Sequence, residues 1–339
     1  MTERIAKLEA YLKAEKLSAG LVFDEFNVRA LTGIECDNAC LVVAPGQKPV
    51  FFTDFRYVPM VHRVAPGLKV KDIKNIRFPG KKVGYEPSMS HARFLGLQKK
   101  FPGVEFVDFE PKIKELRAVK TAEEIEKIRK VEALNDEIWA AAQQKLRPGM
   151  TERDMARVIQ QLMVERGDGE AFATIVCVGK NAAECHHVPD DTKWNGKEPV
   201  LVDMGVKLDG VCADMTRNLV PARASATYRK VYKTVLEANM KAIAGLKPGM
   251  TGKALDKIAR DHIKAAGFGK CFGHSLGHGV GYQVHEAPNA SSKSTMKLEP
   301  GMLVTIEPGI YLEGNLGVRI EDLVLVTENG CEVLSHSAK

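Results

Sequence analysis

Four carboxylates are the residues of this chain whose types and spacing most suggest chemistry. They form two acidic pairs, each within a β-rich run: VLVDMGVKLDGVCADMTR contains Asp203 and Asp214, and VTIEPGIYLEGNLGVRIED contains Glu307 and Glu321. All four lie among apolar, β-branched neighbours, where an unpaired buried charge is very costly. Any one of them could pair with a nearby arginine or occupy a turn. Four of them in two related segments predict a bound cation.

The segment HSLGHGVGYQVHE, residues 274–286, adds three histidines and three glycines. Two histidines four positions apart on a helix would form a familiar metal-binding face. The glycines argue against a helix, since each costs roughly 1 kcal/mol relative to alanine inside one. We therefore expect an extended or looped segment whose backbone comes close to a neighbour. A metal bound by one of these histidines must then take its other ligands from elsewhere in the chain.

Together these groups suit a centre of two divalent ions. Four carboxylates and one imidazole favour hard to borderline metals such as Mn²⁺, Co²⁺ or Fe²⁺, and Zn²⁺ is also possible. Two metals roughly 3.5–4 Å apart need carboxylates to bridge them, and a water that they share is acidified into a hydroxide nucleophile. Glycines near the histidines would allow close approach of backbone and substrate. The residues therefore predict a hydrolase with two divalent metal ions per chain.

An internal duplication in the second part of the chain would position these groups. LRPGMT at 146–151 recurs as LKPGMT at 246–251, and each copy continues into an amphipathic helix, a glycine-rich stop and a strand. After an offset of about four more residues, EPVLVDMG corresponds to EPGMLVTIEPG, which aligns Asp203 with Glu307. The period is too long for a solenoid repeat. We expect two related halves whose matching loops surround one central site.

The first part of the chain has a different pattern. Residues 1–117 alternate helix and strand signals, which suggests a small α/β domain, and we find no site chemistry in them. Thr121 then precedes two glutamates and an apolar series with helical spacing, the pattern of a capped amphipathic helix. We place the domain boundary just before this helix, which leaves 118–339 as a second domain.

Composition excludes several classes of protein. Of the 339 residues, 45% are hydrophobic and 27% are charged, which is typical of globular proteins. The net charge of +6 is scattered, without the basic stripe of a nucleic-acid-binding surface. No segment has the apolar length of a membrane span or a signal-peptide core. Seven cysteines show no disulfide or zinc spacing, and Cys36 and Cys40 are predicted to be buried thiols. We expect a cytoplasmic protein without nucleic-acid or membrane partners.

The order and setting of the site residues resemble the pita-bread metallopeptidases. The matching residues are Asp203, Asp214, His278 in GHG, Glu307 in IEPG and Glu321 in RIED. More narrowly, the chain is similar to the branch that contains aminopeptidase P and prolidase, the Xaa-Pro peptidases. The resemblance covers essentially the whole chain. It implies a creatinase-type α/β N-terminal domain, matched more loosely, and an α+β pita-bread catalytic domain with internal pseudo-twofold duplication.

The resemblance also implies a role for each matching residue. Asp203 would bind one metal alone, while Asp214 and Glu321 would bridge both. His278 and Glu307 would complete the ligands of the other metal, and Glu307 would also shuttle the proton of the attacking water. Four further residues would surround the ligands. His285 would stabilise the tetrahedral intermediate, His186 would line the substrate pocket and Arg319 would orient the carboxylates. His274 would support the ligands, face the substrate or have a merely structural role.

One departure from the family bears on the length of the substrate. Many prolidases carry arginine after the HExP stretch, where HEAPN places Asn289 in this chain. Such an arginine could hold the free carboxylate of a dipeptide, so its absence leaves room for longer peptides. His187 and His262 match no family role and are predicted to be surface or core residues.

The function that the resemblance implies is hydrolysis of the bond between an N-terminal residue and a proline in the second position, by an Xaa-Pro aminopeptidase or Xaa-Pro dipeptidase. It also implies a homodimer. Two alternatives stay open: a non-catalytic pita-bread protein that binds protein or nucleic acid, and a metal-free creatinase-like amidinohydrolase. Both are expected to lack the complete ligand set. A count of about two metal ions per purified chain would favour the peptidase.

Overall fold

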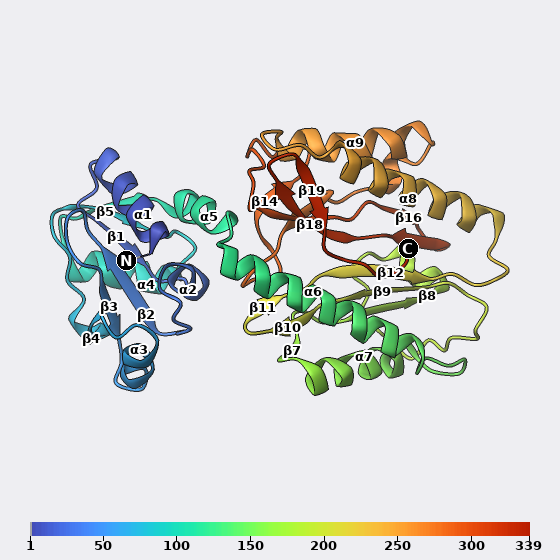
Figure 1. Cartoon of the computed structure of the whole chain (residues 1–339), viewed down its shortest axis with the longest axis horizontal. Coiled ribbons are helices and arrows are strands. Elements are labelled where there is room, and N and C mark those ends of the chain that lie inside the picture. The colour runs from blue at the N-terminus through green and yellow to red at the C-terminus, as the bar shows by residue number, and fades with distance from the viewer. Residues whose placement is uncertain (1) are drawn as a thin grey trace. The chain divides into compact units, whose positions relative to one another are not determined.

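The computed structural model describes residues 2–339. The chain divides into two compact units, Met1–Arg117 and Ala118–Lys339 (Figure 1). The first unit is built on a mixed six-stranded sheet with strand order β4-β3-β2-β1-β5-β6. Its strands are β1 (Ala19–Val22), β2 (Ala39–Val43), β3 (Val50–Thr53), β4 (Lys69–Asp72), β5 (Lys82–Tyr85) and β6 (Glu105–Asp108). Its α-helices are α1 (Glu3–Ala14), α2 (Glu25–Thr32), α3 (Val58–Val64), α4 (His91–Lys100) and α5 (Glu110–Ala118), with a 3₁₀ turn η1 (Ile73–Asn75).

Alternating residues of β2 separate two apolar clusters in this unit. Leu41 and Val43 pack in a cluster that includes the buried leucines of α1, whereas Cys40 and Val42 pack in one that includes Leu97 of α4. Because successive side chains of a strand point to opposite faces, helices cover both faces of the sheet. The α/β domain predicted for this part of the chain is confirmed. Among residues 2–339 all seven cysteines are free, and Cys40 is buried as expected.

The second unit contains four long helices and several small antiparallel sheets. The helices are α6 (Ala122–Gln143), α7 (Glu152–Arg166), α8 (Ala226–Gly245) and α9 (Gly252–Ala265), with 3₁₀ turns η2 (Gly179–Ala183) and η3 (Gly269–Cys271). The strands of the first half are β7 (Gly169–Glu170), β8 (Ile175–Val178), β9 (Val200–Met204), β10 (Val206–Leu208), β11 (Val211–Cys212) and β12 (Met215–Leu219). Those of the second half are β13 (Gly277–Gly279), β14 (Glu286–Ala290), β15 (Leu303–Ile306), β16 (Gly309–Leu312), β17 (Leu316–Arg319), β18 (Asp322–Thr327) and β19 (Gly330–Val333).

Two layers of helices enclose these strands. Figure 1 shows α6 and α7 on one side of the strands and α8 and α9 on the other. One apolar cluster joins α6 and α7 to β8 and β9, and a second joins α8 and α9 to β15 and β18. Each half therefore buries its own helix pair against its own sheet, as two related halves require.

The duplicated PGMT motif forms the same structure in both halves. Gly149 and Gly249 have φ angles of 97° and 84°, in the left-handed region that favours glycine. The threonines that follow cap the next helix: Thr151 Oγ1 accepts a hydrogen bond from a first-turn amide of α7, and Thr251 Oγ1 does the same for α9. Thr151 also forms an isolated β-bridge to Lys193, and Thr251 forms one to Lys297. The shared sequence thus specifies a turn followed by a helix start.

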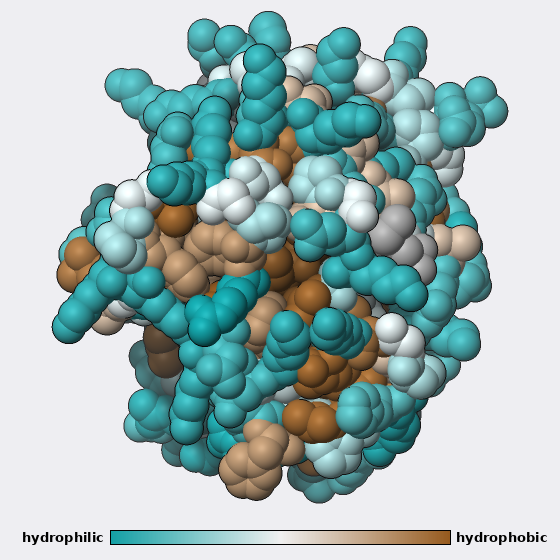
Figure 2. Space-filling model, turned by 90° about the vertical axis from the view of Figure 1, so that its left-hand side faces the viewer, coloured by the Kyte–Doolittle hydropathy of each residue, from teal (hydrophilic) through white to brown (hydrophobic). Residues whose placement is uncertain are grey.

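The helix predicted after the domain boundary is α6. Thr121 and Glu124 form a capping box at its start, in which each side chain accepts a hydrogen bond from the other residue's backbone amide. Within residues 2–339 none of the helices combines the length and apolarity of a membrane span. Figure 2 shows a face of the molecule where polar and charged side chains predominate, with smaller apolar patches between them.

Candidate functional site

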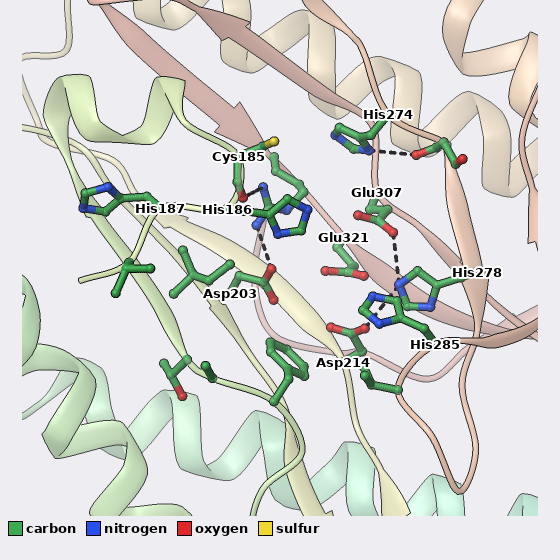
Figure 3. A pocket seen from close by; sticks show the side chains of 18 of the residues that line it. Cys185, His186, His187, Asp203, Asp214, His274, His278, His285, Glu307 and Glu321 are labelled. Carbon is green, nitrogen blue, oxygen red and sulfur yellow. Dashed lines mark hydrogen bonds and ion pairs between the residues drawn. The ribbon is translucent and has the colours of Figure 1, made fainter. Parts of the chain in front are cut away.

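The five predicted metal ligands come from five different places in the second unit. Asp203 lies in β9, Asp214 immediately precedes β12, and β12 pairs with β9 in an antiparallel register. His278 is the centre of β13, Glu307 directly follows β15, and Glu321 directly precedes β18. Figure 3 shows their side chains directed toward a common centre. Strand ends of both halves therefore converge on one site.

A cavity of about 460 Å³ surrounds this centre. Its lining includes all nine residues that sequence analysis assigned to the site: His186, Asp203, Asp214, His274, His278, His285, Glu307, Arg319 and Glu321. The lining also includes apolar residues, namely Phe172, Ala173, Ile175, Val188, Pro189 and Val284. A concave, partly apolar site with a few converging polar groups is the usual form of a ligand-binding pocket.

The carboxylates are packed so closely that they need a cation. Burial and the negative charge of Glu321 raise the pKa of Asp214, and burial and the charge of Glu307 raise the pKa of Glu321. Burial raises the pKa of Glu307 to about 8. Among the described residues, the buried Oδ1 atom of Asp203 has no hydrogen-bond partner. Buried charges of one sign are stable only when they are paired or coordinate a metal.

His278 is in the form that binds a metal. Its Nδ1 lies 3.2 Å from the carbonyl oxygen of Gly279, so Nδ1 carries the hydrogen and Nε2 keeps its lone pair. Burial and, to a smaller extent, the neighbouring His285 lower its pKa to about 4, so the ring is neutral. Nε2 lies 3.3 Å from Glu307 Oε1 and 3.6 Å from Asp214 Oδ2. A lone pair and carboxylate oxygens at these distances repel each other unless they share a cation.

These observations fit divalent metal ions. One nitrogen of His278 and one oxygen each of Asp214 and Glu321 lie within 4.8 Å of one another. Asp203 and Glu307 line the same cavity and add two further carboxylates, and Glu307 Oε1 lies 3.3 Å from His278 Nε2. Carboxylate oxygens and imidazole nitrogens are the ligands that divalent first-row metals accept. The site can hold divalent metal ions.

Arg319 connects ligands from the two halves. Its Nη2 donates to Asp203 Oδ2 at 2.7 Å, and its Nε donates to Thr216 Oγ1 at 3.0 Å. Thr216 Oγ1 in turn donates to Glu321 Oε2 at 2.7 Å. The guanidinium of Arg319 thus holds Asp203 directly and holds Glu321 through the hydroxyl of Thr216. Contacts of this kind orient the ligands of metal sites.

The three histidines outside the metal group occupy different walls of the cavity. Figure 3 shows His186 and His285 beside the carboxylates, and the ring of His285 lies 4.3 Å from that of His278. Burial lowers the pKa of His285, although the charge of Asp203 opposes this. His274 Nε2 lies 2.9 Å from the hydroxyl of Tyr311. Burial, followed by the charge of Arg319, lowers the pKa of His274 to about 4.

Comparisons with known proteins bear on this site. Residues 126–328 match the family described as metallopeptidase family M24, and residues 4–119 match the creatinase/prolidase N-terminal domain. The chain belongs to metallopeptidase family M24. The pita-bread fold and the family predicted from the ligand motifs are therefore confirmed, and the chain is a metallopeptidase with a creatinase-type N-terminal domain.

Similar proteins span the full length of this metallopeptidase. An uncharacterized peptidase of Bacillus subtilis is 35% identical over 331 residues, covering 94% of both chains. The structure of the Xaa-Pro dipeptidase from Bacillus anthracis has a TM-score of 0.93 and 30% identity, covering 99% of this chain and 98% of that one. The prolidase from Pyrococcus furiosus has a TM-score of 0.91 and 33% identity, covering 98% and 100%. The X-Pro aminopeptidase from Thermotoga maritima MSB8 has a TM-score of 0.86 and 30% identity, covering 99% and 98%.

The glycines of the GHG motif have a packing role in the metallopeptidase. A Cβ atom on Gly277 would lie 1.8 Å from the carbonyl oxygen of Thr305, and one on Gly279 would lie 2.2 Å from that of Ala287. The observed close neighbours are thus the chain's own strands, in place of the expected substrate. Without side chains at these positions, β13 can approach β15 closely enough to place His278 beside Glu307.

Helix α6 supports both carboxylates of the first half, which sequence analysis did not foresee. The buried Glu132 accepts a hydrogen bond from the backbone amide of Asp214 at 2.9 Å. Asn135, also fully buried, accepts from the amide of Val206 at 3.1 Å and donates to the carbonyl of Met204 at 3.4 Å. Met204 is the neighbour of Asp203. These side chains therefore fix the backbone beside each ligand.

Helix α8 supports the second half in the same way. The buried Nδ2 of Asn239 donates to the carbonyl of Ile306 at 2.8 Å and to that of Ile320 at 3.5 Å. Each of these residues directly precedes a ligand, Glu307 or Glu321. A sequence signal for this support exists, because positions 135 and 239 differ by 104, as do Asp203 and Glu307.

Proposed function

We propose that this metallopeptidase hydrolyses the bond between an N-terminal residue and a following proline, as an aminopeptidase that accepts peptides longer than two residues. The observation that carries the proposal is the convergence of four carboxylates and a neutral imidazole in one cavity with apolar lining residues. Apolar lining residues suit the ring of proline. Two of the similar structures are an Xaa-Pro dipeptidase and an X-Pro aminopeptidase.

In this proposal two divalent ions bind to the five ligands, with Mn²⁺, Co²⁺ or Fe²⁺ preferred and Zn²⁺ possible. Asp203, Asp214, His278, Glu307 and Glu321 would hold these ions. When bound, such ions act as Lewis acids and lower the pKa of water. The completeness of this ligand set favours the peptidase over a non-catalytic protein or a metal-free amidinohydrolase.

Glu307 is the proposed proton carrier. Thr305 Oγ1 donates to Glu307 Oε1 at 3.1 Å, and the backbone amide of His278 donates to Thr305 Oγ1 at 3.0 Å. This chain of hydrogen bonds holds the carboxylate in one orientation. Glu307 would take the proton of the attacking water and deliver it to the leaving nitrogen of proline, which is the usual task of a general base and acid.

His285 and His186 are the proposed groups that meet the substrate. A neutral imidazole donates one N–H, and His285 lies where that N–H can stabilise the negative charge that develops on the scissile carbonyl oxygen. His186 borders the same space from the first half. His274 is bonded to Tyr311 and lies behind these groups, so we assign it a supporting position.

The charge of the cavity favours longer peptides. Among the described residues that line it, Arg319 is the one side chain with a permanent positive charge. Its N–H groups are already bonded to Asp203, Thr216 and Tyr311. Asn289, across the β13–β14 pair from His278, is exposed and uncharged. The free carboxylate of a dipeptide would therefore find no cation, whereas an extended peptide needs none there.

Three further expectations belong to this proposal. The division of internal contacts at Arg117 and Ala118 supports treating residues 1–117 and 118–339 as the two domains. The resemblance to Xaa-Pro peptidases supports a homodimer, which light scattering would test. We also propose a cytoplasmic location, in which thiols stay reduced.

The test is a substrate comparison with added Mn²⁺ or Co²⁺. Ala-Pro, Ala-Pro-Ala, Ala-Pro-amide and Ala-Ala-Ala differ in the proline and in the free carboxylate beside it. We expect cleavage of both Ala-Pro-Ala and Ala-Pro-amide at least as fast as that of Ala-Pro, and no cleavage of Ala-Ala-Ala. Cleavage of Ala-Pro alone would make the protein a dipeptidase. Failure to cleave any proline peptide would overturn the proposal.

A further inference from the structure

A buried ion pair borders the cavity, whose lining includes His187. His187 is 9% exposed and Glu152, in the first turn of α7, is 0% exposed. His187 Nε2 lies 2.7 Å from Glu152 Oε2. Figure 3 shows that His187 points away from the metal-binding carboxylates, whereas its neighbour His186 lies among them. The two histidines of the ECHHVP segment therefore face opposite sides of the same stretch of chain.

Glu152 holds both ends of the segment that carries these histidines. Its Oε1 accepts from the amide of Val178 at 2.6 Å and from Asn181 Nδ2 at 2.9 Å. Its Oε2 accepts from the amide of Asp190 at 3.0 Å in addition to the bond from His187. The residues between these points contribute to the cavity lining: Cys185, His186, Val188 and Pro189. One carboxylate thus closes the loop that forms part of the substrate wall.

The geometry favours an ion pair over a second metal site at this place. Glu152, His187 and Asp190 have potential ligand atoms within 4.8 Å of one another. However, four N–H donors already occupy the acceptor positions of Glu152, and Asp190 Oδ1 accepts from the amide of Thr192 at 2.7 Å. A carboxylate saturated with hydrogen bonds is a structural anchor.

The charge on His187 strengthens the anchor. Burial alone would lower its pKa, but the hydrogen bond and negative charge of Glu152, together with smaller contributions from other carboxylates, raise it. Glu184 and Asp190 also face the ring and act in the same direction. Because the folded-state pKa is raised, the pair stabilises the loop fully at pH values below the ordinary histidine pKa. This stabilisation is lost as the pH rises through the raised value.

The other half of the catalytic unit has no carboxylate at the matching position. Its histidine segment is held instead by Asp256 of α9, whose Oδ1 accepts from the amide of Leu276 at 3.1 Å. The duplicated PGMT motif places Gly252 where the first half has Glu152. The backbone contacts at the two positions are equivalent, because the amide of Glu152 donates to the carbonyl of Thr192 at 3.1 Å and that of Gly252 donates to the carbonyl of Met296 at 3.0 Å. Only the side chains differ. The pair of Glu152 and His187 is therefore not part of the common scaffold, and its effect falls on the loop of the first half.

We propose that Glu152 and His187 are positioning residues that hold His186 in the cavity for catalysis. The inference rests on the proposed function, because the position of His186 matters to rate only if the cavity binds a peptide. Glu152 is not part of the cavity lining, and the ring of His187 points away from the proposed metal ligands (Figure 3). Their effect passes through the segment of residues 178–190, which Glu152 bonds at Val178 and at Asp190.

Glu152→Gln tests the proposal, with Glu184→Gln as the matched control. Glu184 contacts the other nitrogen of the same ring, Nδ1, at 3.3 Å, but its side chain is 71% exposed. We expect E152Q to lower kcat/KM on Ala-Pro-Ala by about 10- to 100-fold, since small displacements of reacting groups cost that much. E184Q should stay within about twofold of the wild type, because exposed ion pairs contribute little. Bound metal should be unchanged in both.

A double-mutant cycle separates positioning from general stability. If Glu152 acts through His186, then H186A and H186A/E152Q should have the same kcat/KM, because the second change removes nothing that remains. Losses that multiply in the double variant, or full activity of E152Q, would overturn the proposal. H187Q provides a second route to the same loss if E152Q does not fold.

The ring resonances of His186 provide a readout that does not need activity. In a two-dimensional ¹³C–¹H spectrum, E152Q should shift or broaden the His186 signals, whereas E184Q should leave them unchanged. An unchanged His186 signal in E152Q would overturn the inference. A wild-type protein that cleaves no proline peptide would overturn the proposed function instead, and the spectra would still decide whether Glu152 positions the loop.

Discussion

The two halves of the catalytic unit have the same supports but different loops. Thr151 and Thr251 cap equivalent helices, and Asn135 and Asn239 bond to backbone groups beside the proposed metal ligands in both halves. The segments that carry histidines are held by side chains at different positions, Glu152 of α7 in the first half and Asp256 of α9 in the second. The duplicated framework therefore positions the carboxylates by contacts that both halves share, whereas each half positions its histidines by contacts of its own.

Glu152 and Gly252, which occupy matching positions in the two halves, illustrate how the loops differ. A Cβ atom on Gly252 would lie 2.0 Å from the carbonyl oxygen of Asn289, because β14 packs directly on the start of α9. The first half has room for a glutamate at this position, and the carboxylate of Glu152 accepts hydrogen bonds from backbone amides at both ends of a loop. The same helix start thus supports a strand in one half and a catalytic loop in the other. Equivalent backbone positions do not require equivalent functions.

The largest expected effect tests whether both halves are needed for the metal centre. Asp214→Asn in the first half and Glu321→Gln in the second should each lose bound metal and at least about 10³-fold in activity, since each removes a charge from the ligand set. Metal analysis and kcat/KM on Ala-Pro-Ala measure both effects. Retention of two metal ions and full turnover in either variant would show that one half suffices.

The next effect concerns a residue that the second half supplies alone. His285→Ala should lower kcat by about 10²- to 10³-fold, because it removes a donor to the developing oxyanion. KM should change little, since the contact strengthens mainly in the transition state. Metal content and melting temperature are the controls. A normal kcat with a lowered melting temperature would make His285 a packing residue.

A smaller effect tests the shared supports. Asn239→Ala should weaken metal binding by about 10- to 100-fold, because the backbone beside Glu307 and Glu321 loses its anchor. Competition with a chelator measures this affinity. Val235→Ala removes a fully buried side chain from the same helix and should lower stability without changing metal affinity. Equal metal affinities for the two variants would contradict a positioning role for Asn239.

The smallest effect concerns the place where the halves differ. Gly252→Ala should destabilise the protein by about 1–3 kcal/mol, since the added methyl group would force apart α9 and β14. Gly96→Ala is the control, because a Cβ atom on this helical glycine would have no atom within 4 Å. That change should stabilise its helix by about 0.5–1 kcal/mol. Denaturant unfolding that is unchanged by Gly252→Ala would remove the packing explanation.

Local sequence patterns predicted the framework well. The PGMT turns, the capping box at Thr121 and the ligand motifs each depend on residues near one another in the chain or on a strong family pattern. The supporting role of Asn135 and Asn239 could also have been predicted, because these residues have the same separation in the sequence as Asp203 and Glu307. Their signal was missed because one asparagine in an amphipathic helix is not unusual.

Other parts of the site could not be predicted from such patterns. His187 was expected to be a surface or core residue, and its pairing with Glu152 depends on how the loop closes over 35 residues. Tyr311 lies 2.9 Å from both Arg319 and His274, yet nothing in the sequence around it indicates these partners. Such contacts arise from tertiary packing, which brings distant segments together after the local structure has formed.

Metal titration of the wild-type protein tests the central claim most directly. The protein would be freed of metal with a chelator and then titrated with Mn²⁺ or Co²⁺ while hydrolysis of Ala-Pro-Ala is followed. The account predicts no hydrolysis without metal and a plateau of activity at about two ions per chain, because five ligands from both halves serve one dinuclear centre. Full hydrolysis by the metal-free protein, or no binding of either ion, would contradict it.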